Sequence, residues 1–239
     1  MKDEVYFEFI CSIEKGSSRN EYCDSITREI LHSLLHPELF IFLSRHSSVK
    51  GIPTLSVHTP GNLSEAKFGG EPDKVSISPA SAMKNALLEM SRLTKERELE
   101  FEVSYECTHH GPSLNSPTMF VELGSSPKQW KNVKAAEVVA DSAVAALSNC
   151  SSYNVNLGIG GPHYNSKFSK LALQSNRAFS HMIPKYALSE LDLELLKQCV
   201  EKTLETVDTV VLDWKGIKGE YKKKIIEMIN EIDLIYEKI

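Results

Sequence analysis

Residues 101–112 read Phe101-Glu102-Val103-Ser104-Tyr105-Glu106-Cys107-Thr108-His109-His110-Gly111-Pro112. Apolar and polar side chains alternate in its first half, which predicts a strand near 100–107. Successive side chains of a strand point to opposite faces, so His109 and His110 can serve one site only where the extended chain breaks. Gly111 and Pro112 supply that break. The stretch therefore predicts a strand that ends at a candidate functional site.

Strand-length apolar runs alternate with longer segments of helical period along the rest of the chain. This pattern predicts an α/β fold, with a mixed, mostly parallel sheet covered by helices on both faces. The expected strands are 4–12, 39–44, 53–58, 100–107, 118–123, 153–159, 178–183 and 208–213. The expected helices are 20–35, 79–97, 131–148, 189–206 and 219–237.

The composition describes an ordinary globular chain. The 239 residues are 41% hydrophobic and 25% charged, enough to bury a sizeable core. A formal charge of -5 gives no global attraction to nucleic acid or to an anionic membrane. Five scattered cysteines without a CxxC pair argue against a disulfide framework, and the simplest compartment is the reducing cytoplasm. No apolar run reaches membrane-spanning length, so no membrane partner is expected.

The chain is expected to form one domain over residues 1–239, because no linker, repeat or low-complexity tract interrupts it. The longest irregular stretch is 59–78, which glycines and prolines punctuate. Loops of this length in compact domains are often functional, so the segment is a candidate lid or small subdomain. A surface insertion explains the same composition. A monomer or a small homo-oligomer is expected.

Five histidines follow predicted strand ends in chain order: His46, His58, His109, His110 and His163. The carboxyl ends of parallel strands form the ligand crevice of open α/β sheets, so these side chains can converge. Imidazole titrates near neutral pH and is the commonest metal ligand, so the cluster suggests a zinc site or a general base. No helical HExxH motif is present, so a zinc site would be assembled from separate loops.

Two carboxylates compete for an acid–base role. Glu106 stands at the mouth of its predicted strand, and Glu122 lies between Val121 and Leu123 in an apolar strand. Burial would raise the proton affinity of either carboxylate, which suits general acid–base chemistry. Either could instead form an ion pair or orient a histidine.

A glycine loop follows another predicted strand, in the run Gly158-Ile159-Gly160-Gly161-Pro162-His163-Tyr164. Without side chains, Gly160 and Gly161 allow backbone N–H groups to approach a substrate, as an oxyanion-stabilising loop requires. A tight structural turn is the alternative. The chain has no P-loop and no GxSxG elbow, which argues against nucleotide-triphosphate and serine-nucleophile chemistry.

Lysines concentrate near the carboxyl end. Residues 213–224 hold five lysines against two acidic residues. Lysines in the first turn of the expected final helix interact unfavourably with the helix dipole, and an anionic partner would offset that free-energy cost. Phosphate contact is therefore predicted, with Trp214 or Tyr221 available for base stacking. A solvated lysine face is the alternative. The candidate phosphate contacts are Lys215, Lys222, Lys223 and Lys224.

Eight motifs together resemble the archaeal and plant type of D-aminoacyl-tRNA deacylase, from about residue 40 to residue 219. They are SRHSS (44–48), HTPGN (58–62), FGG (68–70), ECTHHGP (106–112), FVELGSS (120–126), GIGGPHY (158–164), FSHMIPKYAL (179–188) and LDWKG (212–216). The resemblance implies hydrolysis of the ester that joins a D-amino acid to the terminal ribose of tRNA. It also implies a phosphorylase/hydrolase-like α/β fold and zinc as the cofactor. The residues that match are His109, His110, His163, Gly160 and Gly161.

Chemistry and resemblance lead to one mechanistic hypothesis. Zinc held by some of His58, His109, His110 and His163, or a histidine alone, activates water, while the Gly160–Gly161 backbone stabilises the oxyanion. The catalytic candidates are Glu106, His109 and His110. The candidate substrate contacts beside them are His46, Asn62, Glu122, Gly160, Gly161 and Tyr164.

Two other functions stay open at the level of sequence. A zinc-dependent amidohydrolase or peptidase would cleave small substrates without any dependence on tRNA. A non-catalytic tRNA-binding module would bind charged tRNA and leave its ester intact.

Overall fold

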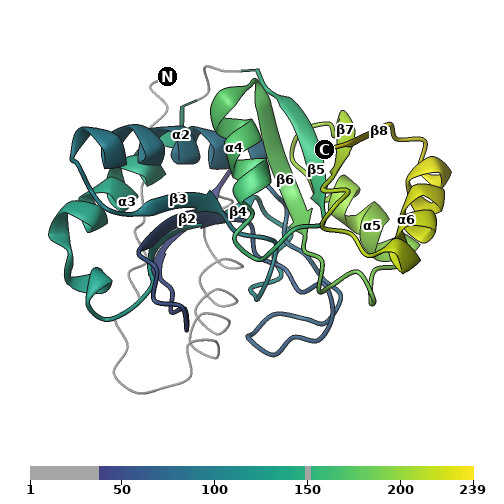
Figure 1. The fold of residues 1–239 in the computed structure, drawn as a ribbon, viewed down its shortest axis with the longest axis horizontal. Coiled ribbons are helices and arrows are strands. Elements are labelled where there is room, and N and C mark those ends of the chain that lie inside the picture. Colours follow the sequence, from purple (N-terminus) through teal and green to yellow (C-terminus); the bar gives the residue numbers. More distant parts are fainter. Residues whose placement is uncertain (1–37, 149–151) are drawn as a thin grey trace.

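The computed structural model describes residues 38–148 and 152–239, and its strands form two four-stranded sheets (Figure 1). The first sheet has the order β1-β4-β2-β3 and contains β1 (Phe40–Arg45), β2 (Thr54–His58), β3 (Glu102–Tyr105) and β4 (Thr118–Gly124). It is mixed, because β1 and β4 are parallel, β2 and β3 are parallel, and β2 runs antiparallel to β4.

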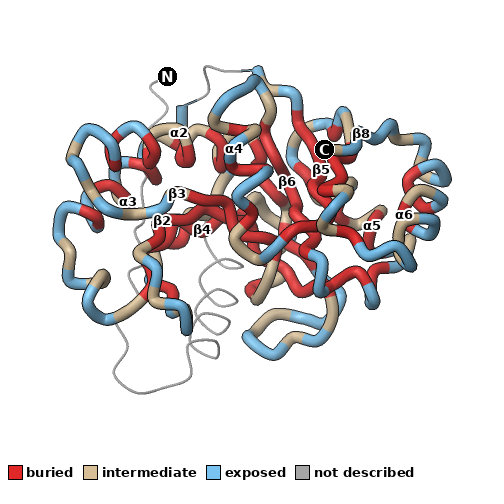
Figure 2. Tube along the Cα trace, in the orientation of Figure 1, coloured by how far each residue is buried: buried red, intermediate tan, exposed pale blue. Residues whose placement is uncertain are grey.

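The second sheet is parallel throughout. Its order is β6-β5-β7-β8, formed by β5 (Asn154–Ile159), β6 (Arg177–Ile183), β7 (Thr209–Leu212) and β8 (Tyr236–Lys238). The prediction of an α/β fold with mixed and mostly parallel strands is confirmed. The structure divides those strands between two sheets, whose buried cores appear in Figure 2.

Helix α2 (Ala80–Glu96) covers one face of the first sheet and also reaches the second. It begins directly after Pro79, whose fixed φ suits a helix start. Its side chains at helical spacing, Met83, Leu87 and Met90, are fully buried. They share a core with alternate residues of β2 and β4 and with α3 (Val133–Ala145), which follows the short 3-10 helix η1 (Gln129–Lys131). This packing leaves the other face of the first sheet for polar side chains.

Helix α4 (Ser166–Gln174) has no counterpart among the helices predicted from the sequence. The side chain of Asn165 caps it by accepting a hydrogen bond from the Phe168 N–H. The same side chain donates to the carbonyl oxygen of Gly160 at 3.0 Å, and the Asn165 N–H donates to the Tyr105 carbonyl oxygen at 3.0 Å. Asn165 therefore fastens α4 to the ends of strands from both sheets.

The carboxyl-terminal part differs from its prediction in two places. Helix α5 (Leu193–Glu201) is shorter than the expected 189–206, because Asp192 caps it by accepting from the Leu195 N–H. Helix α6 (Gly219–Glu231) ends well before residue 237. Asp233 adopts a positive φ of 54°, which ends a helix, and the chain then pairs with β7 as β8.

Two predicted elements, the strand at 4–12 and the helix at 20–35, lie outside the described residues. Within residues 38–148 and 152–239, none of the helices has the length and apolar character needed to cross a bilayer.

Replacing Asn165 with alanine tests whether this residue joins the two sheets. The variant loses a helix cap and leaves the Gly160 carbonyl without its partner, so the free energy of unfolding should fall by about 1 to 3 kcal/mol. Urea unfolding of Asn165→Ala measures the change. The control is Asn230→Ala on the exposed face of α6, which should stay within about 0.5 kcal/mol of the parent. Equal stability of the two variants would contradict this role.

Candidate active site

A row of polar side chains crosses the face of the first sheet that α2 and α3 leave uncovered. Strand register places Glu122 beside Ser44 on one side and beside Ser56 on the other. The Ser44 hydroxyl donates to Glu122, and the Ser56 hydroxyl donates to Glu106 at 2.5 Å. Both carboxylates are almost completely buried, at 3% and 1% exposure. Each is therefore held by a hydroxyl from a neighbouring strand.

Three histidines meet above this row. His58 ends β2, while His109 and His110 lie in the turn that follows the parallel strand β3. The ring centre of His58 lies 4.4 Å from that of His109 and 5.0 Å from that of His110. His163, which follows β5 of the other sheet, places its ring centre 4.3 Å from that of His109. The predicted convergence of these four histidines is therefore observed.

The irregular segment 59–78 holds the histidine turn in place. The Gly61 N–H donates to the His110 carbonyl oxygen at 2.7 Å, and the Gly111 N–H donates to the Phe68 carbonyl oxygen at 3.1 Å. A Cβ atom on Gly111 would lie 2.4 Å from the backbone of Gly69, so only glycine fits there. The segment is thus packed against the site at residues 61 and 68–70.

Asn62 belongs to this packing. Its amide nitrogen donates to the carbonyl oxygens of Gly69 at 2.8 Å and Glu71 at 3.1 Å. Both amide hydrogens are committed to the loop, which gives Asn62 a structural role. The expected substrate contact of Asn62 stays a prediction.

The three imidazoles share one hydrogen-bonding pattern. The Nδ1 atoms of His58, His109 and His110 lie 3.2, 2.8 and 2.5 Å from the carbonyl oxygens of Thr59, Cys107 and Gly111. A carbonyl oxygen only accepts, so each Nδ1 carries a proton, and in the neutral ring Nε2 presents its lone pair. In metal sites, the histidine nitrogen that does not bind the metal usually donates its N–H to a carboxylate, a backbone carbonyl or water. Nδ1 of all three rings has such a carbonyl partner here, and Nε2 is left for a metal ion.

The environment favours the neutral form of two of these rings. Burial and the neighbouring His58 lower the pKa of His110 to about 4. Burial also lowers the pKa of His109 well below its ordinary value. The buried Nε2 of His58 has no hydrogen-bond partner among the described residues and lies 3.5 Å from a Glu122 oxygen. Candidate ligand atoms of His58, His109 and His110 all lie within 4.8 Å of one another, so the trio can hold a metal ion.

His163 has different partners. Its Nε2 lies 2.8 Å from a Glu106 oxygen, and its Nδ1 lies 3.0 Å from the Tyr186 hydroxyl and 3.2 Å from the Cys107 sulfur. Burial lowers the pKa of His163, but hydrogen bonds with Cys107 and Glu106 outweigh that effect and raise it to about 10. Cys107, His109 and His163 form a second group that could hold a metal ion, and His58, Glu106 and Glu122 form a third.

The pKa values of the two carboxylates are shifted in the direction opposite to the one expected. Burial by itself raises the pKa of Glu106, but the hydrogen bond from His163 outweighs it, and the pKa falls below its ordinary value. Burial likewise raises the pKa of Glu122, but the nearby rings of His58 and His110 outweigh that effect and lower it. Both groups are therefore ionised at neutral pH. The expectation of raised proton affinity was wrong because it considered burial without the histidine partners.

The glycine loop is closed by packing on one side. The Gly160 N–H donates to the Ile183 carbonyl oxygen at 2.8 Å, so it is not available to an oxyanion, and that part of the prediction is contradicted. Gly160 and Gly161 have φ values of 99° and 80°, and Cβ atoms there would crowd Ile217 and Asn165. The two glycines are explained by this close approach.

His46 and Tyr164 form a pair at the edge of the site. The Tyr164 hydroxyl lies 2.9 Å from Nδ1 of His46, and Tyr164 forms a bridge with Glu106 through the backbone. Burial raises the pKa of the Tyr164 hydroxyl, so it stays protonated at neutral pH. These two predicted substrate contacts lie together, next to His163.

The predicted lysine surface lies elsewhere. Helix α6, with Lys222, Lys223 and Lys224, covers the far side of the second sheet, apart from the first sheet that holds the histidines (Figure 1). The ammonium group of Lys222 lies 4.4 Å from the Trp214 ring centre, and Lys223 pairs with Glu227. Lys215 is exposed in the loop after β7. The structure does not bring these lysines to the cluster, and a lysine contacts the tryptophan expected to stack on a base.

Four residues of the site were not predicted: Ser44, Ser56, Cys107 and Tyr186. The two serines carried a signal, because Ser44 follows the apolar run 40–43 and Ser56 lies between Leu55 and Val57. Cys107 belonged to the quoted stretch but had no recognisable partner. Tyr186 comes from the segment after β6, and nothing in its local sequence links it to His163. Together the fold and site define an α/β protein with a histidine–carboxylate centre of the kind that hydrolases use.

This chain belongs to the D-aminoacyl-tRNA deacylase family, whose sequence model matches residues 33–236. A D-aminoacyl-tRNA deacylase of Pyrococcus furiosus is 41% identical over 219 residues, covering 91% of this chain and 80% of the relative. One from Thermococcus kodakarensis is 43% identical over 217 residues, covering 89% and 78%. A crystal structure of a conserved protein of unknown function is similar with a TM-score of 0.82 and 33% identity, covering 89% of this chain and 75% of that one.

Histidine NMR of the metal-free protein tests the protonation states directly. Nitrogen-15 shifts should show protonated Nδ1 in His58, His109 and His110. His110 should titrate near pH 4 and His163 near pH 10. The raised pKa of His163 means that the stability from its ion pair is complete below about pH 6.5 and is lost as pH rises through about 10. Titration of all the cluster histidines near 6.5 would contradict the assignment.

Proposed function

We propose that this chain is a single-domain, cytoplasmic hydrolase that cleaves the ester of D-aminoacyl-tRNA and releases the free D-amino acid and tRNA. The relatives that cover most of its length are named for this activity. The observation that carries the proposal is the meeting of His58, His109 and His110 beside two ionised, buried carboxylates. An activated aminoacyl ester needs only an oriented water molecule, a base and stabilisation of the tetrahedral oxyanion.

We further propose that zinc is held by the Nε2 atoms of His58, His109 and His110. Three imidazoles are a known donor set of catalytic zinc sites. The buried Nε2 of His58 fits this role, because it has no hydrogen-bond partner among the described residues and lies 3.5 Å from a Glu122 oxygen. A bound cation would give the Nε2 lone pair a partner. A bound zinc ion supplies two things: it lowers the pKa of a water molecule and polarises a carbonyl group.

Glu106 acts as the general base in this proposal. It is ionised at neutral pH, lies 3.5 Å from His109 Nε2 and is fixed by Ser56, so it can accept a proton from water held at the histidines. His163 is protonated at neutral pH and hydrogen-bonded to Glu106. It can therefore donate a proton to the ribose oxygen that leaves. The pair carries a proton from the attacking water to the leaving group.

His46 and Tyr164 orient the substrate in this proposal. The Tyr164 hydroxyl remains a hydrogen-bond donor at neutral pH, and His46 fixes its direction. Glu122 acts through His58 rather than on the substrate, because its oxygens face Ser44 and His58. Gly161 remains a predicted backbone donor to the oxyanion, without Gly160.

Deacylation of D-tyrosyl-tRNA and L-tyrosyl-tRNA, with and without 1,10-phenanthroline, tests the function. The parent protein should hydrolyse the D-ester and spare the L-ester, and the chelator should abolish turnover until zinc is restored. His109→Ala and His110→Ala should each lower turnover by about 10²-fold or more, because each removes a ligand from the centre. Zinc content of each variant is measured alongside.

The matched control is His181→Gln, which changes a buried histidine that bonds Thr108 and Lys202 outside the cluster. It should keep most of the turnover, and circular dichroism should show all variants folded. Near-normal turnover in both alanine variants would refute the assignment. Cleavage of small amides without tRNA would favour an amidohydrolase, and binding without cleavage would favour a tRNA-binding module.

A further inference from the structure

We infer that a groove beside the active site holds the sugar–phosphate backbone of the single-stranded 3′ end of tRNA. The groove has a volume of about 1250 Å³. This exceeds the roughly 300–1000 Å³ typical of sites for small ligands. We call it the lysine groove, after Lys50, Lys95 and Lys170 on its walls. The inference rests on the proposed function and adds where the RNA lies.

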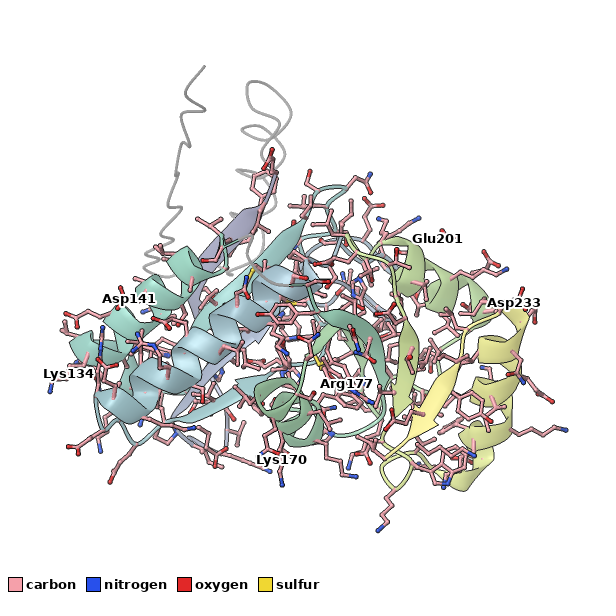
Figure 3. All side chains as sticks on the ribbon, turned by 90° about the horizontal axis from the view of Figure 1, so that it is seen from above. Lys134, Asp141, Lys170, Arg177, Glu201 and Asp233 are labelled. Atoms are coloured by element: carbon pink, nitrogen blue, oxygen red, sulfur yellow. The ribbon has the colours of Figure 1, made fainter. Side chains whose placement is uncertain are left out.

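The lysine groove starts at the active site. Pro162, His163 and Tyr164 form part of its wall, so it shares two residues with the proposed proton-transfer and substrate-orienting groups. From there its wall includes residues 102–104 of the edge strand β3, together with parts of α2 and α4. Figure 3 shows α2 and α4 near one another, with Lys170 extending outward from α4. A chain bound at the ester can therefore leave the site along this path.

Charge along the lysine groove favours a polyanion. Its lining has four basic side chains, Lys50, Arg92, Lys95 and Lys170, against one acidic side chain, Glu102. Arg92 is paired with Glu89 and Glu96, whereas the three lysines are exposed and form no ion pair within residues 38–148 and 152–239. They come from the turn between β1 and β2, from α2 and from α4, and they gather although the whole chain carries a net charge of -5. Lysines arranged along a path suit successive phosphates.

Hydroxyl groups add hydrogen-bonding capacity between the charges. Exposed Ser47 and Ser166 line the lysine groove near the Tyr164 end. Serine hydroxyls contact both phosphate oxygens and ribose hydroxyls without reading sequence. The lysine and serine side chains, which stand among apolar lining residues such as Ile52, Leu88 and Val103, therefore suit the 3′ end shared by all tRNAs.

The lysines of α6 offer less to the same substrate. Lys222 contacts Trp214 and Lys223 pairs with Glu227, so part of their charge is already used. Their helix also lies on the far side of the second sheet from the histidine cluster (Figure 1). The ester must reach the histidines, so the nucleotides next to it lie in the lysine groove.

Binding of two fluorescent acceptor-stem minihelices tests the inference, one with the single-stranded 3′ CCA end and one without it. The triple variant Lys50→Ala/Lys95→Ala/Lys170→Ala should raise the Kd of the tailed minihelix by at least about tenfold and leave that of the blunt one nearly unchanged. Loss of three single-strand phosphate contacts should also reduce the slope of log Kd against log salt by about 2. D-tyrosyl-adenosine, an ester without phosphodiesters, should be hydrolysed at the parent rate.

Two further triple variants complete the experiment. Lys134→Ala/Lys197→Ala/Lys218→Ala removes the same charge from exposed Lys134 on α3, half-buried Lys197 on α5 and exposed Lys218 before α6, and should leave the Kd unchanged. Lys222→Ala/Lys223→Ala/Lys224→Ala tests the competing surface. Equal weakening by the groove and control triples, loss only with the α6 triple, or no binding by the parent would overturn the inference. Slower cleavage of the adenosine ester by the groove triple would also overturn it.

Failure of the proposed function gives a different result. A parent protein that hydrolyses neither ester refutes the deacylase proposal, while the minihelix comparison still reports whether the lysine groove binds the 3′ end.

Discussion

The whole site depends on keeping Glu106 and Glu122 ionised inside the protein. Burying a charge costs several kcal/mol unless partners offset it. Here each carboxylate accepts from a serine on a neighbouring strand and faces a histidine, His163 for Glu106 and His58 for Glu122. The first sheet makes this possible, because the parallel pairing of β1 and β4 sets Ser44 beside Glu122. The parallel pairing of β2 and β3 brings His58 and the histidine turn to the same end.

The two sheets meet at this polar row. The Cys107 N–H donates to the His163 carbonyl oxygen at 2.9 Å, and the Asn165 N–H donates to the Tyr105 carbonyl oxygen at 3.0 Å. These bonds hold the end of β3 against the loop after β5. His163 can therefore reach Glu106 from the other sheet, and the same junction forms one end of the lysine groove. One contact between the sheets therefore places the proposed proton-transfer pair next to the groove that is proposed to hold RNA.

The local sequence predicted the features of the fold that depend on interactions between residues close together in the chain. The alternation before Glu106, the break at Gly111–Pro112 and the apolar stripe of α2 each gave an element close to its observed place. The convergence of His58, His109, His110 and His163 followed from their positions after strand ends. Contacts between residues far apart in the sequence could not be predicted from local patterns. The hydrogen bond to Ile183 that occupies the Gly160 N–H, the histidine partners that lower both carboxylate pKa values, and the contact of Tyr186 with His163 all join distant segments.

X-ray absorption of the zinc-loaded protein tests the central claim most directly, because it identifies the atoms around the metal. A site formed by His58, His109 and His110 predicts only nitrogen and oxygen neighbours, with imidazole nitrogens at about 2.0–2.1 Å. The competing group of Cys107, His109 and His163 would add a sulfur at about 2.3 Å. Sulfur in the first shell, or no zinc bound at stoichiometric level, would contradict the account.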